Sequence, residues 1–302
     1  MITVVLGLCG AIIYGFADFL GGVASRQLRP VAVTAMTATI GILPLIVGLA
    51  LFGGRFSPAT VVFGLIGGVS GGIGILLLYA ALAVGPMSVL SPITAVFSAL
   101  VPAVVGLARG SALPPLSIGA LIAGIISVVL VAAVPDRSGA RLTVRGILAA
   151  VIAGCGFGGL VLAYDATPAD AGVAPLVVAR ILEAVLLSLA AVASLSRTGR
   201  RQRRRQRAPF VASAALRSRL GWRFWLVVVA CGVCDASANV FIQSALHSSG
   251  DPSTLPVVSV LNALYPIGTI ALACVALRER LTTIQASGIA LAVASSAVLA
   301  LH

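Results

Sequence analysis

Long apolar runs alternate with short polar connections along almost the whole chain. Each run is roughly 20 residues long, which at about 1.5 Å per residue of helix spans a hydrocarbon core about 30 Å thick. The runs are continuously apolar and do not alternate at a period of two, so they predict helices and not the strands of a membrane barrel. Prolines, glycine clusters and charges divide them into ten predicted spans: 2–24, 31–53, 60–83, 87–108, 115–134, 146–165, 172–195, 224–246, 253–275 and 282–301.

An internal repeat links the two halves of this pattern. At an offset of 164 residues, spans three to five fall on spans eight to ten without a gap. The coinciding glycines and prolines are Gly68 with Gly232, Pro92 with Pro256, Pro102 with Pro266, and Gly124 with Gly288. A unit of five spans crosses the membrane an odd number of times, so its second copy runs in the opposite sense. The predicted fold is an all-α integral membrane protein of ten transmembrane helices in two inverted five-helix repeats, residues 1–138 and 139–302.

Composition supports a membrane location. The 302 residues are 60% hydrophobic and only 9% charged, with a mean hydropathy of +1.14, whereas soluble domains carry about 25% charged residues. The first apolar run has no basic segment before it and no A-x-A-like cleavage site, so we expect it to be retained. The five cysteines lie inside apolar runs and do not predict a disulfide framework.

The formal charge of +12 comes from arginines that lie mostly in one connection. Ten of the twenty lie between Arg197 and Arg223, and the run RRQRRRQR (200–207) could in principle bind RNA or anionic lipid. Connections after odd-numbered spans hold seventeen arginines and the others hold two. Since basic residues are retained on the cytoplasmic side, we interpret loop 196–223 as a cytoplasmic topology anchor of a plasma membrane protein, with both termini outside and no nucleic-acid partner.

The first span contains an aspartate in the stretch GFADFLGG, Gly15 to Gly22. Acids within membrane spans are rare and usually face the bundle interior or a water-filled cavity. Tyr14 lies one helical turn before Asp18, on the same face, and Gly21 and Gly22 allow another helix to approach closely. We expect Asp18 and Tyr14 to line a cavity; the alternative is a protonated structural acid bonded to a neighbour.

The eighth span carries a polar stripe, Asp235, Asn239 and Gln243, spaced by four residues on one helical face. In lipid these groups must face protein or water. We interpret the stripe as the cavity wall opposite Asp18, with polar contacts between helices as the alternative.

In the seventh span, Arg180 and Glu183 have the i, i+3 spacing of an intrahelical pair. Arg180 either meets an anionic group of a substrate or simply neutralises Glu183.

Two pairs of prolines occupy corresponding spans of the two repeats. Pro92 and Pro102 lie in span four, and Pro256 and Pro266 in span nine. Proline removes a helical hydrogen bond, so these four residues are candidate hinges, with static kinks as the alternative. Paired interruptions in both halves are also typical of the binding region of inverted-repeat transporters.

Two enzyme-like motifs are better interpreted as packing. GCGFGG (154–159) fits the G-x-G-x-x-G dinucleotide motif but lies inside a predicted span without a preceding strand. Cys231-x-x-Cys234 likewise lacks the context of a redox motif. We therefore expect no cofactor and no metal site.

Several stretches together resemble the EamA-type carriers of the drug/metabolite transporter superfamily. They are YGFADFLGGVASR, LYAALAVGPMSVLSPITAVFSALVP, IQSALHSSGDPSTLPVVSVLNALYP and LRERLTTIQASGIAL, the last with Glu279 at the family's acidic position. The resemblance covers nearly the whole chain and implies ten spans in two repeats and secondary transport. Pro115 stands where Glu279 does in the second copy, so that acid is not duplicated.

The sequence thus predicts a carrier, not an enzyme, that moves a small metabolite or drug-like solute by alternating access. Asp18 and Asp235 are candidates for a coupling proton, because a carboxyl group desolvated in a membrane cavity can load and release one. A passive channel or an integral membrane enzyme is the alternative, although His247 and His302 are isolated from the ligand spacings of metal enzymes. The pattern leaves the solute, the direction, the coupling ion and the oligomeric state open.

Overall fold

The computed structural model describes residues 2–108, 115–132, 142–203, 221–249, 254–276 and 282–301, and all regular structure in those ranges is helical. The elements are α1 (Ile2–Gln27), α2 (Pro30–Phe52), α3 (Pro58–Val84), α4 (Met87–Ala108), α5 (Pro115–Ala132), α6 (Val144–Asp165), η1 (Ala169–Ala171), α7 (Ala174–Arg203), α9 (Trp222–Leu246), α10 (Thr254–Asn262), α11 (Pro266–Ala276) and α12 (Thr283–Leu301). The predicted all-α class is confirmed. Glu279 and residues 204–220 of the arginine-rich loop lie outside the described residues.

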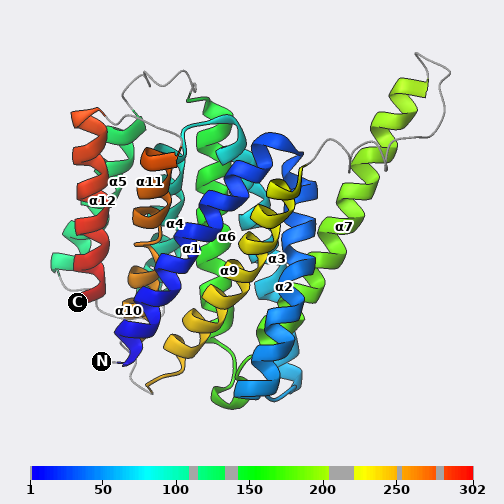
Figure 1. Cartoon of the computed structure of the whole chain (residues 1–302). Coiled ribbons are helices and arrows are strands. Elements are labelled where there is room, and N and C mark those ends of the chain that lie inside the picture. Colours follow the sequence, from blue (N-terminus) through cyan, green and yellow to red (C-terminus); the bar gives the residue numbers. More distant parts are fainter. Residues whose placement is uncertain are drawn as a thin grey trace.

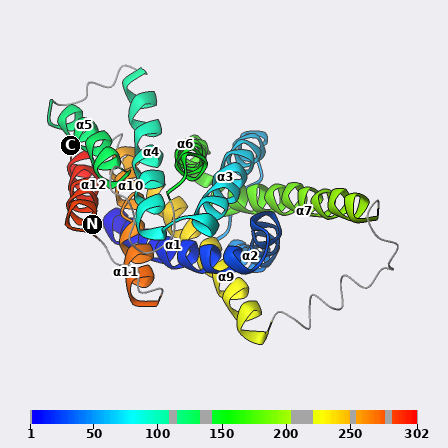
Figure 2. The same cartoon turned by 90° about the horizontal axis from the view of Figure 1, so that it is seen from above.

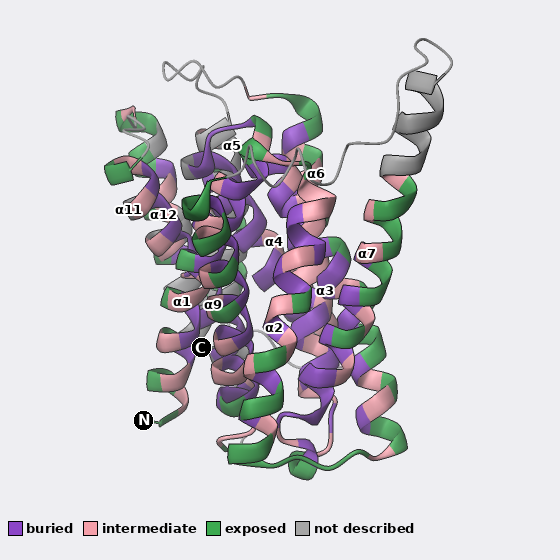
Figure 3. Cartoon of the chain, turned by 45° about the vertical axis from the view of Figure 1, so that its right-hand side comes forward, coloured by how far each residue is buried: buried purple, intermediate pink, exposed green. Residues whose placement is uncertain are grey.

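In the part of the chain that the structure describes, six helices are long and apolar enough to cross a membrane: α1, α2, α3, α6, α9 and the segment Ala174–Ser194 of α7. Their outer faces expose large apolar side chains, such as Leu43, Val62 and Ile152. In Figure 3 the buried residues concentrate where the helices face one another, while exposed residues occupy the outward faces. Exposed apolar faces of this extent are stable against lipid and not against water, so the fold is that of a helical membrane protein.

The helices form two layers (Figure 2). One layer consists of α3, α6 and α4, in which α6 packs against both neighbours; the other consists of α2, α9, α1 and the pair α10 and α11. Helix α7 packs against α2 and α3 at one edge of the two layers, and α5 pairs with α12 at the opposite edge. In Figure 1, α7 extends beyond the rest of the bundle, and both chain ends lie toward the lower side.

Glycines permit close contact between α6 and its neighbours. A Cβ atom added to Gly156 would lie 2.7 Å from the Ser70 carbonyl oxygen and 3.0 Å from Gly74 Cα, both backbone atoms of α3. The neighbouring Gly154 faces the backbone of α4 at Thr94 in the same way. The glycines of GCGFGG therefore serve helix packing, as their position in an apolar span predicts.

The predicted ninth span is interrupted near its middle. Helix α10 ends at Asn262 and α11 begins at Pro266, with residues 263–265 between them in a turn. Pro266 has no N–H to donate to the Asn262 carbonyl, which instead accepts from the Tyr265 N–H at 3.1 Å. Pro92 and Pro102, by contrast, lie inside the continuous helix α4. The paired prolines therefore do not produce paired interruptions.

Candidate functional site

A cavity lies between the two layers and is lined by helices of both. The space between its wall atoms is about 450 Å³ when open solvent is included, and only a small part of that space is wide enough for a water molecule. The lining residues come from α1, α3, α6, α9 and α10 and from the turn after α10; they are Tyr14, Asp18, Ile75, Phe157, Leu160, Val161, Tyr164, Asp235, Ile242, Asn262 and Tyr265. Asp18, Asp235 and the turn all lie near the middle of their helical segments, away from the ends of the bundle.

Asp18 lies on the cavity wall and is 4% exposed. In the described part of the chain its carboxylate makes no hydrogen bond and no ion pair. The glycines that follow Asp18 admit neighbouring helices: a Cβ on Gly21 would meet the Tyr79 ring of α3, and one on Gly22 would lie 2.6 Å from Met87 Cε of α4. Tyr14 lines the same cavity one turn earlier, as its spacing predicts.

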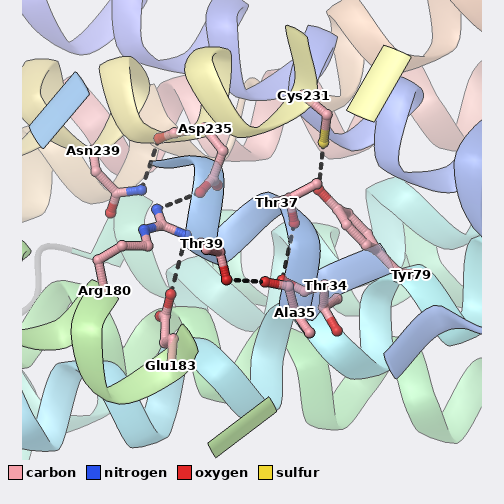
Figure 4. A network of polar contacts seen from close by, with 10 residues as sticks. All are labelled: Thr34, Ala35, Thr37, Thr39, Tyr79, Arg180, Glu183, Cys231, Asp235 and Asn239. Carbon is pink, nitrogen blue, oxygen red and sulfur yellow. Dashed lines mark hydrogen bonds and ion pairs between the residues drawn. The ribbon is translucent and has the colours of Figure 1, made fainter. Parts of the chain in front are cut away.

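Asp235 belongs to a buried network of three charged groups (Figure 4). Arg180 donates from Nη2 to Asp235 Oδ2 and from Nη1 to Glu183 Oε2, the latter at 3.0 Å. All three side chains are buried. The spacing of Arg180 and Glu183 predicts their pair; the contact with Asp235 joins α7 to α9 and has no signal in the sequence. The guanidinium is bonded to two carboxylates and does not reach the described cavity wall, so in this conformation the network matches the neutralising interpretation of Arg180.

Small residues make room for this network within the bundle. A Cβ on Gly41 of α2 would lie 3.3 Å from Arg180 Nε, and one on Gly71 of α3 would lie 2.9 Å from Glu183 Oε1. A larger side chain at either position would displace one of the charged groups. Glycines on α2 and α3 therefore position groups carried by α7.

The rest of the α9 stripe does not line the described cavity. Asn239 donates from Nδ2 to the Asp235 carbonyl of its own helix at 2.9 Å. Gln243 donates from Nε2 to Thr167 Oγ1 at 3.1 Å, and His247 Nε2 lies 3.1 Å from the Thr167 carbonyl. The lower part of the stripe thus joins the end of α9 to the end of α6, which is the predicted alternative of polar contacts between helices. Since α1 and α9 pack together, Asp18 and Asp235 lie on adjacent helices and not on opposite walls.

The turn between α10 and α11 forms another part of the cavity wall. Tyr265 donates from its hydroxyl to the Ser91 carbonyl of α4 at 3.2 Å, and Thr269 donates from Oγ1 to the Gly15 carbonyl of α1 at 3.1 Å. Asn262, the last residue of α10, has a buried Oδ1 with no hydrogen-bond partner. The turn is thus bonded to α1 and α4 while it presents Asn262 and Tyr265 to the cavity.

A second, apolar space lies behind this turn. The space between its wall atoms is about 230 Å³ when open solvent is included. It is lined by Pro92, Ala95 and Val96 of α4, by Ala263 and Pro266, and by Ile289 and Val293 of α12. Two of the four candidate hinge prolines, Pro92 and Pro266, therefore face one another across it. Pro102 is buried elsewhere on α4, and Pro256 lies within α10.

Several cavity residues were not predicted from the sequence. Phe157, Tyr164, Asn262 and Tyr265 are ordinary members of apolar spans, and Phe157 lies inside the glycine motif. Asn262 and Tyr265 carry one usable signal, because Tyr265 directly precedes Pro266 within a span and Asn262 lies one helical turn before that proline. The others have no sequence signal that separates them from lipid-facing or packing residues.

The arrangement combines two wall carboxylates with aromatic and aliphatic surfaces in a cavity between two helical layers. It can bind a small solute that brings positive charge or hydrogen-bond donors, and its described walls carry no Lys, Arg or His. Such a cavity at a helix break is typical of membrane proteins that bind a solute within the bilayer. The class that fold and cavity define is a helical membrane protein with a buried cavity whose wall carries two carboxylates.

Comparisons with known proteins give information on the fold of the chain but not on its function. No protein-family model matches the sequence, and a search of curated proteins finds no match. Among solved structures, 28 chains match, so the fold is not particular to this chain. One of them, described only as the crystal structure of a protein, is 22% identical with a TM-score of 0.63 and covers 99% of this chain and 96% of its own. The two chains are therefore similar in fold over nearly their whole lengths.

Proposed function

We propose that the chain is a secondary carrier of the EamA type in the drug/metabolite transporter superfamily, with ten spans in two inverted repeats. It moves a small metabolite or drug-like solute by rocking one repeat against the other. The observation that carries the proposal is the cavity, which holds an unpaired buried carboxylate and is lined by helices from both predicted repeats. Alternating access requires such a site between two moving units.

The pattern of helix contacts supports two equivalent repeats. In the predicted correspondence α1 matches α6, α2 matches α7, α3 matches α9, α5 matches α12, and α4 matches α10 and α11. Under that exchange the contact of α1 with α9 becomes that of α6 with α3, and the contact of α2 with α9 becomes that of α7 with α3; both members of each pair are present. Helix α9 also begins 164 residues after α3, which is the offset of the sequence repeat. Two contacts of the first repeat thus have a counterpart in the second, as equivalent repeats would produce.

Hydrogen bonds between connections support an alternating path through the membrane. Arg26 donates to the Gly85 carbonyl at 3.2 Å, which joins the connections after spans one and three. Arg55 pairs with Asp170 at 3.3 Å, which joins those after spans two and six. His247 Nε2 lies 3.1 Å from the Thr167 carbonyl oxygen, which joins the connections after spans six and eight. Odd connections thus meet odd ones and even connections meet even ones, as expected if each span crosses from one side to the other.

Transport is tested with purified protein in liposomes. We expect saturable counterflow of at least one solute from a panel of amino acids, amines and other small metabolites. Asp18→Asn should abolish it, because it removes charge from the cavity wall. Asp235→Asn should abolish it as well, and its thermal unfolding is measured alongside because Asp235 also pairs with Arg180. Asp170→Asn is the matched control, since Asp170 is an exposed acid outside the cavity and its loss should leave counterflow unchanged.

Two other outcomes separate the alternatives. Ohmic conductance without exchange would show a channel and end the carrier proposal. Counterflow that continues unchanged whatever the proton gradient would remove proton coupling from Asp18 and Asp235 and leave the carrier intact.

A further inference from the structure

The cavity holds more negative than positive charge. Asp18 and Asp235 line it, and none of its described lining residues is cationic. Arg180, behind the wall, divides its guanidinium between Asp235 and Glu183. One buried cation therefore serves two carboxylates, and Asp18 has no positive partner in the described part of the chain. A buried carboxylate without a partner is costly, so it is stabilised either by a proton or by an occupant that carries positive charge.

The charged group of the wall that lacks a partner is an acceptor, the carboxylate of Asp18. The Oδ1 atom of Asn262 is also buried without a hydrogen-bond partner, and the hydroxyls of Tyr14 and Tyr164, which have no partner among the described residues, can both donate and accept. Because a buried acceptor gains most from a donor, the group that suits this wall carries N–H bonds as well as charge. A protonated amine has two or three such donors, whereas a quaternary ammonium group has none.

The remaining surface of the cavity is aromatic and aliphatic. Four aromatic rings line it, those of Tyr14, Phe157, Tyr164 and Tyr265. The faces of aromatic rings attract cations through their quadrupoles. Ile75, Leu160, Val161 and Ile242 add aliphatic surface on α3, α6 and α9. This wall suits a small apolar body attached to the charged group.

We infer that the cavity selects a protonated primary or secondary amine with a small apolar body and no carboxylate. The inference rests on the proposed function in that it names the solute of the same cavity. An amino acid is disfavoured because its carboxylate would lie beside Asp18 and Asp235, with the guanidinium of Arg180 already bonded to two acids. A neutral alcohol is disfavoured because it leaves the charge of Asp18 uncompensated.

Four probes with one phenylethyl body separate these chemistries: phenethylamine, phenylalanine, trimethyl(2-phenylethyl)ammonium and 2-phenylethanol. Binding to purified protein in detergent is measured from the concentration dependence of thermal stabilisation. We expect phenethylamine to bind, and the other three to bind at least about 10-fold more weakly, which corresponds to the loss of one charge-assisted hydrogen bond.

Variants of two cavity residues test whether phenethylamine binding depends on the cavity wall. Asp18→Asn should weaken phenethylamine binding by about 10- to 100-fold, because it removes the charge that faces the ammonium group. Asn262→Ala should weaken phenethylamine binding by about 10-fold. This variant tests the wall independently if Asp18→Asn does not fold. Asp170→Asn, an exposed acid outside the cavity, should leave binding unchanged.

Three results would overturn the inference: no binding of phenethylamine, equal or tighter binding of phenylalanine or of the quaternary probe, or undiminished binding of phenethylamine by both wall variants. The carrier proposal fails separately. Binding of phenethylamine without counterflow of the labelled amine in liposomes would leave an amine site and remove the carrier. Counterflow of another solute without binding of phenethylamine would leave the carrier and remove the amine site.

Discussion

The network of Arg180, Asp235 and Glu183 places three buried charges on two helices. Such networks are rarely a large net source of stability, because desolvation of the ions offsets their attraction. Removal of a single partner is different, since it leaves a charge buried without compensation. The network therefore makes the contact between α7 and α9 intolerant of single substitutions.

We predict that Arg180→Met destabilises the protein by about 3–5 kcal/mol, because it leaves two buried carboxylates without their cation. The measurement is thermal unfolding of the purified variant in detergent. The matched control is Arg55→Met, which breaks the exposed pair with Asp170 and should cost less than about 1 kcal/mol.

A combined variant isolates the cause of that loss. Arg180→Met together with Asp235→Asn and Glu183→Gln removes all three charges, and it should recover much of the lost stability. If Arg180→Met is no more destabilising than Arg55→Met, the buried network does not hold α7 to α9.

Helix α1 packs closely against the interrupted ninth span. A Cβ on Gly15 would lie 2.5 Å from the Tyr265 carbonyl oxygen and 3.0 Å from Gly268 Cα, both backbone atoms. Thr269 adds a hydrogen bond to the Gly15 carbonyl. The first helix is therefore fitted against the turn that carries Tyr265, and the apolar space beside Pro92 and Pro266 lies behind that turn.

We predict that Gly15→Ala destabilises the protein by about 1–3 kcal/mol, because the backbone at residues 265–268 must move to admit a methyl group. Counterflow should fall as well, because Tyr265 would shift on the cavity wall. Thermal unfolding and the liposome assay measure the two effects.

Gly10→Ala is the control for this prediction. It lies on the same helix, but its Cβ would mainly meet the terminal Cδ1 atom of Ile242 at 2.8 Å, and that flexible side chain can turn aside. Its effect should stay within about 1 kcal/mol, since the helix propensity of alanine offsets the crowding. Equal losses in both variants would mean that α1 has no special fit to the turn.

The whole molecule has two chemically different ends. Arg26, Arg29 and Arg145 lie at the end where the odd connections meet, and Arg55 lies at the other end with Asp170 as its partner. The ten arginines of 197–223 belong to a further odd connection. Because basic residues are retained in the cytoplasm, the end with the odd connections is expected to be cytoplasmic.

We predict that a single cysteine in the arginine-rich loop, Ser213→Cys, is protected in intact cells from a membrane-impermeant thiol reagent. Phe56→Cys, on the exposed connection after α2, should react from outside. Both are placed in a background without the five native cysteines. The reverse labelling pattern would overturn the arginine-based orientation, and labelling of both sites from outside would contradict the alternation of spans.

Local chemistry accounts for what the sequence determined about this protein. Runs of apolar residues define the helices, since in a bilayer each backbone group must be bonded within its own segment. The helical period places Tyr14 with Asp18 and Arg180 with Glu183. Of the four candidate hinge prolines, only Pro266 stands at an interruption of the described helices, so the missing N–H alone does not locate the break. Glycines in an apolar span indicate close helix contacts, as Gly156 shows against α3.

Only the tertiary structure decided which polar groups meet. The pairing of Arg180 with Asp235, the attachment of Gln243 to Thr167 in place of a cavity position, and the unpartnered Oδ1 of Asn262 depend on how neighbouring helices are rotated and shifted against one another. That register is set by many small packing contacts along each helix, none of which has a signal of its own in the sequence. The sequence therefore predicts that Asp18 needs a polar surrounding, and the packing of the two layers leaves it facing a cavity whose described walls carry no cation.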